Sequence, residues 1–120
     1  MIVAGFGFRR GAGEASLRDA LQRASAGRKV AALATVADKA GALHGLAAGM
    51  GVAVIGVSEA EMAEMVTVTR SAASLRARGV GSVAEAAALA GAGRGAALLG
   101  ARALSGDRMA SCAIAEGDGR

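Results

Sequence analysis

Residues 29–57, KVAALATVADKAGALHGLAAGMGVAVIGV, decide the fold class of this chain. The apolar run at 29–36 predicts a buried strand, and the apolar run at 52–57 predicts a second one. Between them, residues 41–50 place apolar side chains on one helical face, and Gly51 follows where a left-handed residue ends a helix. A strand, a helix and a strand in this order are typical of a mostly parallel α/β sheet.

The N-terminal segments continue this alternation. Residues 2–6 form a short apolar run ended by glycines, which predicts a strand, and residues 14–26 carry leucine and alanine at helical spacing. Ser58 opens the sequence Ser-Glu-Ala-Glu, whose serine and second glutamate can satisfy each other's exposed helix-start amides. We therefore expect a helix from this serine through about residue 65.

The C-terminal half contains one irregular segment and three regular ones. Residues 66–81 are rich in Thr, Ser and Arg and predict a loop with some turn of strand or helix. Residues 82–90 repeat the capping-box spacing in Ser-Val-Ala-Glu and are otherwise rich in alanine, which predicts the clearest helix. Residues 96–99 and 109–115 are strand candidates, and the turn-forming residues 105–108 between them predict a late hairpin.

Together these elements predict one α/β domain over residues 1–120. We expect a three-layer αβα arrangement in which the central sheet is mostly parallel and the C-terminal hairpin forms an antiparallel edge. A chain of 120 residues has room for one core. With 53% hydrophobic and 20% charged residues it should fold by itself, although we expect the tail from about residue 116 to be disordered.

The composition argues against a membrane protein and a secreted protein. Gly, Arg, Lys or Asp interrupts every apolar run before it reaches the roughly 18 residues needed to cross a bilayer. The basic pair Arg9 and Arg10 follows the first apolar segment instead of preceding it, unlike the pattern of a secretory signal. We therefore expect a cytoplasmic location and no membrane partner.

Cys112 and His44 are the only cysteine and histidine, and neither has a companion at disulfide or zinc-ligand spacing. We therefore expect no metal centre built by the protein, and we assign no cofactor. Cys112 lies in the apolar run 110–115, where a buried, unreactive thiol is expected instead of a nucleophile with an activating neighbour. His44 is expected to be a solvated helix residue.

The formal net charge of +4 favours an anionic partner, which could be nucleic acid, a phosphate compound or a polycarboxylate. Charge alone does not choose among these classes. Single-strand binders add stacking aromatic residues to a basic groove, whereas this chain has only Phe6 and Phe8 as aromatic residues. We therefore expect no nucleic-acid partner.

Three loops are candidates for a ligand site, because ligands of open α/β sheets bind beyond the carboxyl ends of the strands. These loops are residues 5–13, 35–39 and 57–59. Arg9, Arg10 and Lys39 lie in them and would suit a ligand with several carboxylates, since arginine binds carboxylates bidentately. The alternative is that each of these charges is simply solvated on the surface.

The glycines of the first loop would let backbone amides approach an anion at the start of the next helix. Its spacing is not that of a nucleotide-binding loop, because Arg10 occupies the third glycine position and no Gly-Lys-Ser or Gly-Lys-Thr follows. Asp38, Glu59 and Asp107 are carboxylates without a recognisable partner motif. We therefore assign no catalytic residue.

Four stretches of the chain resemble one family. They are Gly5-Phe-Gly-Phe-Arg-Arg-Gly-Ala, the pair Asp38-Lys39, Gly79-Val-Gly-Ser-Val-Ala-Glu-Ala-Ala-Ala, and Ser105-Gly-Asp-Arg-Met-Ala-Ser-Cys-Ala-Ile-Ala. In this order over one domain they resemble CobE and the C-terminal domain of CbiG, a family of cobalamin biosynthesis proteins. The sequence departs from the family at Ala101-Arg102, where Pro-Lys would be expected, although Arg102 keeps the positive charge.

The resemblance implies a part in building the corrin ring, with a corrin or precorrin intermediate as ligand and other cobalamin-pathway enzymes as possible partners. CbiG-type enzymes open a δ-lactone on a cobalt-precorrin with loss of acetaldehyde. Because the match covers only the C-terminal domain of CbiG, this activity is not carried over. A corrinoid carrier or accessory factor of the aerobic pathway is the first expectation, and a pure interaction subunit is one alternative.

Another alternative is a precorrin hydrolase or lyase with Asp38 or Glu59 as the general base and an arginine that stabilises oxyanion charge. For the first expectation, the basic side chains Arg9, Arg10 and Lys39 would pair with ring carboxylates, while glycines and a serine would offer backbone amides or a hydroxyl. The expected ligand-binding residues are Gly5, Gly7, Arg9, Arg10, Gly11, Asp38, Lys39 and Ser82.

Overall fold

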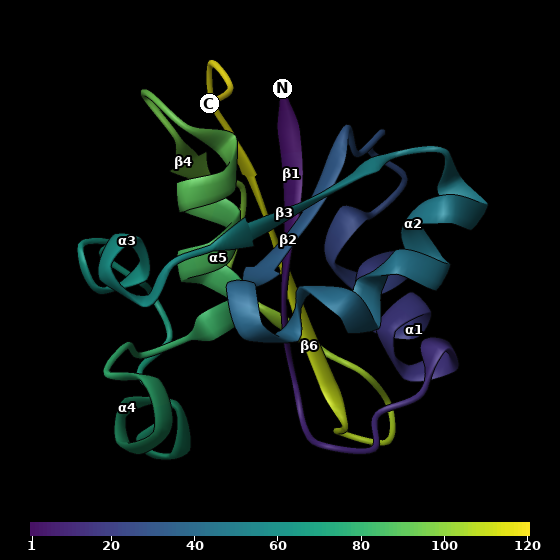
Figure 1. Ribbon diagram of the computed structural model, residues 1–120, viewed down its shortest axis with the longest axis horizontal. Helices are drawn as coiled ribbons and strands as arrows, with labels where there is room; N and C mark the ends of the chain where they lie inside the picture. The colour runs from purple at the N-terminus through teal and green to yellow at the C-terminus, as the bar shows by residue number, and fades with distance from the viewer.

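A single mixed sheet organises the computed structural model, which describes all 120 residues (Figure 1). Its strand order is β3-β2-β1-β6-β4, and β5 also pairs with β6. The strands are β1 (Ile2–Phe8), β2 (Ala32–Val36), β3 (Ala53–Val57), β4 (Ala97–Leu98), β5 (Ala103–Leu104) and β6 (Ala110–Glu116). The helices are α1 (Glu14–Ser25), the 3-10 helix η1 (Ala37–Leu43), α2 (His44–Met50), α3 (Glu59–Ala63), α4 (Ala72–Arg78) and α5 (Val83–Ala92).

The pairing confirms the predicted α/β fold class. β1, β2 and β3 are parallel to one another, whereas β6 runs antiparallel to β1 from Ile2 opposite Glu116 to Phe8 opposite Ala110. The short strands β4 and β5 are antiparallel to β6 and form the far edge of the sheet. The C-terminal hairpin therefore supplies the antiparallel part of the sheet, as predicted, with β6 as its inner strand.

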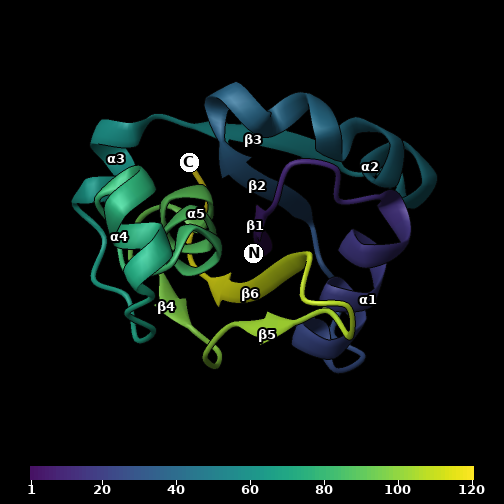
Figure 2. The same cartoon turned by 90° about the horizontal axis from the view of Figure 1, so that it is seen from below.

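Helices cover both faces of the sheet, which gives the three layers seen in Figure 2. One core cluster lies between the sheet and α5, and a second lies between the sheet and α1 and α2. Successive residues of a strand point to opposite faces, so Val3 belongs to the first cluster and Ala4 to the second. Since both faces are buried, β1, β2 and β6 have almost continuous apolar sequences.

The contact between α5 and β1 is unusually close. A Cβ atom added to Gly5 would lie 2.1 Å from the carbonyl oxygen of Ala84 and 2.3 Å from the amide nitrogen of Ala88. A Cβ atom on Gly91 would lie 2.9 Å from Cγ1 of Val3. The glycine and alanine content of these segments thus lets the helix backbone pack almost directly on the strand backbone.

Two N-terminal elements differ from their predicted bounds. β1 continues to Phe8, because Gly5 and Gly7 do not end the strand but lie inside it, beneath α5. The turn after β2 is a 3-10 helix over residues 37–43, so the chain is helical before the predicted start at residue 41. In a sequence, glycines and an Asp-Lys pair usually mark the end of a strand or the start of a loop. Here packing against neighbouring elements determines where β1 ends and where the helix after β2 begins.

The segment 66–81 contains the helix α4. Ser71 caps it by accepting a hydrogen bond from the amide of Ser74, and Gly79, with φ of 73°, ends it in the left-handed conformation. The sequence of this segment is otherwise irregular, and these two caps are the local pattern that could have predicted the helix. The predicted helix from Ser58 ends earlier, at Ala63.

The C-terminal residues that we expected to be disordered form backbone hydrogen bonds with the N-terminus and with the end of α5. The amide of Gly117 donates to Met1, that of Asp118 to Arg94 and that of Gly119 to Ala92. Both termini thus lie together at one end of the sheet (Figure 1). No helix in the structure combines the length and the apolar character that a membrane span requires.

We predict that Gly5→Ala destabilises the protein by about 1–3 kcal/mol, because the new methyl group meets the backbone of α5 and the helix must move away. Gly49→Ala is the matched control, since a methyl group added to Gly49 in α2 would meet no atom within 4 Å. That control should gain about 0.5–1 kcal/mol from reduced chain entropy. Urea denaturation measures both, and equal stability of the two variants would contradict the close packing.

Candidate functional site

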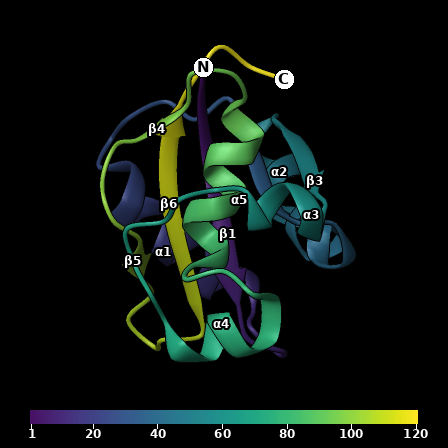
Figure 3. The same cartoon turned by 90° about the vertical axis from the view of Figure 1, so that its left-hand side faces the viewer.

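A cleft of about 500 Å³ lies at the carboxyl ends of β1 and β2. Residues from the end of β1, the start of β6 and α4 line it. In Figure 3, α4 lies at the same end of the sheet as the end of β1 and the start of β6. The lining residues are Gly7, Phe8, Arg9, Thr35, Val36, Lys39, Ser71, Ala73, Ser74, Ala77, Arg78, Val83, Arg102, Leu104, Arg108, Met109, Ala110 and Ser111. The volume is typical of a small-molecule site.

The charged residues that line the cleft are all cations, and no aspartate or glutamate is among them. They are Arg9, Lys39, Arg78, Arg102 and Arg108. Only Arg78 takes part in an ion pair, so the other four have no carboxylate partner. A concave surface lined by one sign of charge concentrates its field, and this one attracts anions.

Lys39 is held in a fixed position at the point where β1 and β2 end. Its Nζ donates a 2.7 Å hydrogen bond to the carbonyl oxygen of Phe8 and lies 4.9 Å from the centre of the Phe8 ring. Burial, Arg78 and Arg10 lower the pKa of Lys39, and Asp38 opposes them only in part. An anion bound beside this ammonium group would offset the repulsion from the two arginines.

Arg78 joins α4 to the segments that follow β2 and β3. Its guanidinium donates two hydrogen bonds to Asp38, of 3.0 and 3.1 Å, and one of 2.5 Å to Glu59. Hydrogen bonds to Asp38 and Glu59 raise the pKa of Arg78 above its ordinary value. The two carboxylates that we considered as general bases therefore both anchor α4 through this arginine.

Glu85 is a fully buried carboxylate on α5, behind the cleft. It accepts hydrogen bonds of 2.8 Å from the amides of Val68, Thr69 and Arg102, and one of 2.7 Å from the Thr69 hydroxyl. Burial raises the pKa of Glu85, but the bonds from Thr69, Arg102 and Val68 outweigh it and lower the pKa below its ordinary value. One side chain thus fixes both the approach to α4 and the turn that carries Arg102.

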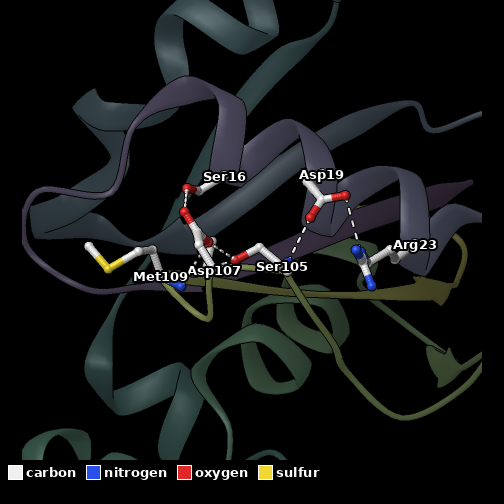
Figure 4. Close-up of polar contacts among 8 residues, drawn as sticks. Ser16, Asp19, Arg23, Ser105, Asp107 and Met109 are labelled. Carbon is white, nitrogen blue, oxygen red and sulfur yellow. Dashed lines mark hydrogen bonds and ion pairs between the residues drawn. The ribbon is translucent and has the colours of Figure 1, made fainter.

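The turn before β6 is fastened to α1 by two aspartates (Figure 4). Asp107 accepts hydrogen bonds from the hydroxyls of Ser105 (2.6 Å) and Ser16 (2.5 Å) and from the amide of Met109 (3.1 Å). These bonds lower the pKa of Asp107 to about 2, and the bond from Ser105 has the largest effect, followed by those from Ser16 and Met109. On α1, Asp19 accepts from the amide of Gly106 at 2.7 Å.

Arg108 reaches the cleft from this turn with a backbone conformation that is rare for a residue with a side chain. Its φ is 61°, in the left-handed region, where glycine would be favoured. Arg108 also donates its amide to Ser105, and Met109 accepts from the amide of Arg9, so the turn joins the end of β1. The bonds around Asp107 thus hold a strained residue that carries one of the cleft cations.

The structure brings only part of the expected ligand-binding set to the cleft. Gly7, Arg9 and Lys39 line it, whereas Asp38 lies beside it in the ion pair with Arg78. The other four lie elsewhere: Gly5 beneath α5, Arg10 and Gly11 exposed in the turn after β1, and Ser82 buried as the cap of α5.

Sequence reasoning missed the cleft residues that come from the second half of the chain. Arg78 lies in the segment expected to be mainly a loop. The capping residues Ser71 and Gly79 were the only local pattern that could have predicted the helix that carries it. In sequence, Arg102 stands out only as a departure from the family, and Arg108 only as part of a turn. No local pattern shows that these arginines meet the cations at the ends of β1 and β2.

The cysteine and the histidine, each present once in the chain, lie outside the lining of the cleft. Cys112 is fully buried, and burial raises the pKa of its thiol, which disfavours the thiolate that a nucleophile needs. His44 is exposed at the start of α2. No group of three or more His, Cys, Asp and Glu side chains is arranged to hold a metal ion.

Comparison with known proteins identifies one family. The family model described as "Cobalamin synthesis G C-terminus" matches residues 2–115. The solved structure of CobE, a protein from the cobalamin (vitamin B12) biosynthetic pathway, is 40% identical, with a TM-score of 0.84 over 96% of this chain and 89% of that chain. The resemblance drawn from the four sequence stretches is thereby confirmed.

A second solved structure supports the same family. The cobalamin biosynthesis protein chiG from Agrobacterium tumefaciens is 28% identical, with a TM-score of 0.72 over 98% of this chain and 99% of that chain. No curated protein is similar enough to count as a relative. The two similar structures cover nearly the whole of this chain and are themselves nearly covered by it.

We predict that Glu85→Ala destabilises the protein by about 3–5 kcal/mol, because three backbone amides and one hydroxyl lose their carboxylate acceptor. Glu85→Gln should fall between this variant and the wild type, since an amide keeps one accepting oxygen. Glu64→Ala, which changes an exposed glutamate with no side-chain hydrogen bond, is the control. Thermal unfolding measures all three variants. An unchanged Tm for Glu85→Ala would contradict the stabilising role of this carboxylate as a hydrogen-bond acceptor.

We predict an acid-dependent loss of stability that depends on Asp107. Its folded pKa of about 2 lies below the ordinary value of 3.8, so its contribution is present above the unfolded pKa and is lost as the pH falls through about 2. In Asp107→Asn, stability should fall less steeply below about pH 4. Urea denaturation at several pH values tests this, with Asp118→Asn, which changes an exposed aspartate without side-chain hydrogen bonds, as the control that should keep the wild-type slope.

Proposed function

This chain belongs to the CobE and CbiG C-terminal family of cobalamin biosynthesis proteins, and we propose that its cleft binds a carboxylate-bearing corrin or precorrin intermediate. In this proposal the protein is a cytoplasmic carrier or accessory factor of the aerobic pathway. The supporting observation is the cleft lined by five cations and no acidic residue. A ring that carries several carboxylates matches this arrangement better than a ligand with one charge.

The geometry of the cations supports a ligand whose charges are spread around its edge. Arg9 comes from the end of β1, Arg102 from the turn before β5, and Arg108 from the turn before β6, so they approach the cleft from different elements. Arginine forms paired hydrogen bonds with a carboxylate, and four of the five cations are not occupied by protein carboxylates. Several separated carboxylates could therefore be bound at once.

The remaining lining is suited to an apolar ring. Phe8, Val36, Val83, Leu104 and Met109 contribute apolar surface between the charged positions. Ligand sites generally combine such surface with a few polar groups that set the orientation. In this proposal the macrocycle contacts the apolar side chains while its acidic side chains reach the cations.

The hydrolase alternative has less support from the structure. A general base must accept a proton, whereas Asp38 and Glu59 are both engaged in ion pairs with Arg78, which stabilise their charged forms. Neither carboxylate lines the cleft. Binding without chemistry therefore explains more of the observed arrangement, and detection of acetaldehyde or a mass change in a bound precorrin would favour the enzyme instead.

The proposal predicts that hydrogenobyrinic acid, a corrin with free carboxylates, changes its absorbance spectrum when titrated with the protein at tens of micromolar. Arg9→Gln and Arg102→Gln should each weaken binding about tenfold, because each removes one charged contact. Arg28→Gln, which removes an exposed arginine outside the cleft and outside any ion pair, is the matched control.

Salt and ligand charge provide the second part of this test. Affinity should fall as ionic strength rises, and a corrin whose carboxylates are converted to amides should bind more weakly. No spectral change with the free acid would overturn the proposal. Equal weakening by Arg28→Gln and by the cleft variants would show a nonspecific attraction to a basic protein instead of a site.

A further inference from the structure

Two residues other than glycine have a left-handed backbone in this structure, and they differ in where they lie. Ala26, with φ of 48°, ends α1 outside the cleft, where a left-handed residue is the usual way to end a helix. Arg108, with φ of 61°, lies in the turn before β6 and lines the cleft. This conformation is unfavourable for a residue with a side chain, and strained residues of this kind cluster at functional sites.

Hydrogen bonds fix the residues on both sides of Arg108 (Figure 4). Asp107 accepts one from the hydroxyl of Ser16 on α1 at 2.5 Å and one from the amide of Met109 at 3.1 Å. It also accepts a bond of 2.6 Å from the hydroxyl of Ser105, which is itself buried. A return of Arg108 to the right-handed region would move its two neighbours and break these bonds.

The turn also brings Arg108 close to a second cation of the cleft. The amide of Arg9 donates a 2.9 Å hydrogen bond to the carbonyl oxygen of Met109, the residue that follows Arg108. Both arginines line the cleft, and neither is paired with a carboxylate. Because like charges repel, a turn without restraint would let Arg108 move away from the cleft into solvent. The bonds around Asp107 oppose that movement.

We propose that Asp107 is a positioning residue, which together with Ser16 holds Arg108 in its left-handed conformation and directs the guanidinium toward a ligand carboxylate in the cleft. This inference rests on the proposed function and explains how one of its cations is kept in place. The strain lowers the stability of the free protein, but the charge is already oriented when the ligand arrives. Through this contact α1 affects binding, although none of its residues lines the cleft.

The strain is tested by two glycine substitutions. Arg108→Gly and Ala26→Gly should each raise Tm by about 3 °C, because glycine adopts the left-handed conformation without strain. Arg108→Gly should bind hydrogenobyrinic acid about tenfold more weakly, since the cation is lost, whereas Ala26→Gly should keep the wild-type affinity. A rise in Tm for Ala26→Gly without one for Arg108→Gly would show that Arg108 is not strained and would reject the proposal.

The positioning role is tested by a double-mutant cycle. Asp107→Ala should weaken binding about tenfold, although the loss of a negative charge would by itself strengthen the binding of an anion. Ser16→Ala, which removes one bond and no charge, should weaken it about threefold. The matched control is Ser25→Ala, which removes a serine of α1 outside the cleft that has no side-chain hydrogen bond and should leave affinity unchanged.

The second half of the cycle repeats these substitutions in Arg108→Gln. There, Asp107→Ala and Ser16→Ala should change affinity no further, because no guanidinium remains to be positioned. A loss of the same size in this background would show a general structural effect and overturn the positioning role. If Asp107→Ala does not fold, the cycle with Ser16→Ala decides the question.

Mellitate, a flat benzene hexacarboxylate, serves as a second probe in the same assays. If the wild type binds mellitate but not hydrogenobyrinic acid, the proposed function is overturned and the role of Asp107 is decided by mellitate affinity. If the wild type binds either probe and both Asp107→Ala and Ser16→Ala bind it equally well, the positioning role alone is overturned. Binding of neither probe by the wild type rejects both proposals.

Discussion

The buried carboxylate of Glu85 holds together the parts of this protein that are remote in sequence. Its four hydrogen bonds come from the segment before α4 and from the turn before β5, while the residue itself belongs to α5. A buried charge is costly unless hydrogen bonds replace its hydration, and here every bond comes from a group that also needs a partner. The cleft exists in this form because one side chain fixes two of its walls at once.

Glu85 can take this position only because α5 lies so close to the sheet. Gly5 leaves no room for a side chain between β1 and the backbone of Ala84 and Ala88, so the helix backbone approaches the strand almost directly. The start of α5 then lies near the carboxyl ends of β1 and β2, where open α/β sheets bind ligands. The glycine and alanine content of the chain thus determines where the walls of the cleft can stand.

The predictable part of the molecule is the part encoded by local periodicity. Apolar runs and helical spacing predict the sheet, its three layers and the C-terminal hairpin, and the strand-end rule brings Arg9 and Lys39 to one cleft. Arg78, Arg102 and Arg108 were not assigned to it, because their meeting depends on contacts between segments far apart in sequence. Gly5 shows the opposite error, since a glycine needed for helix packing looks the same in sequence as one that frees an amide for a ligand.

Acidic and basic residues are divided between two tasks around the cleft. The cations face its interior, whereas Asp38, Glu59, Glu85 and Asp107 lie outside the lining and hold the walls through hydrogen bonds and ion pairs. Four unpaired cations in one concave surface repel one another, and this repulsion disfavours the folded state in the absence of an anion. Carboxylates placed inside the cleft would relieve that repulsion but would also occupy the charges. By placing them behind the walls, the fold keeps its rigidity while the cations stay free, which is the arrangement that a site for a multiply anionic ligand requires.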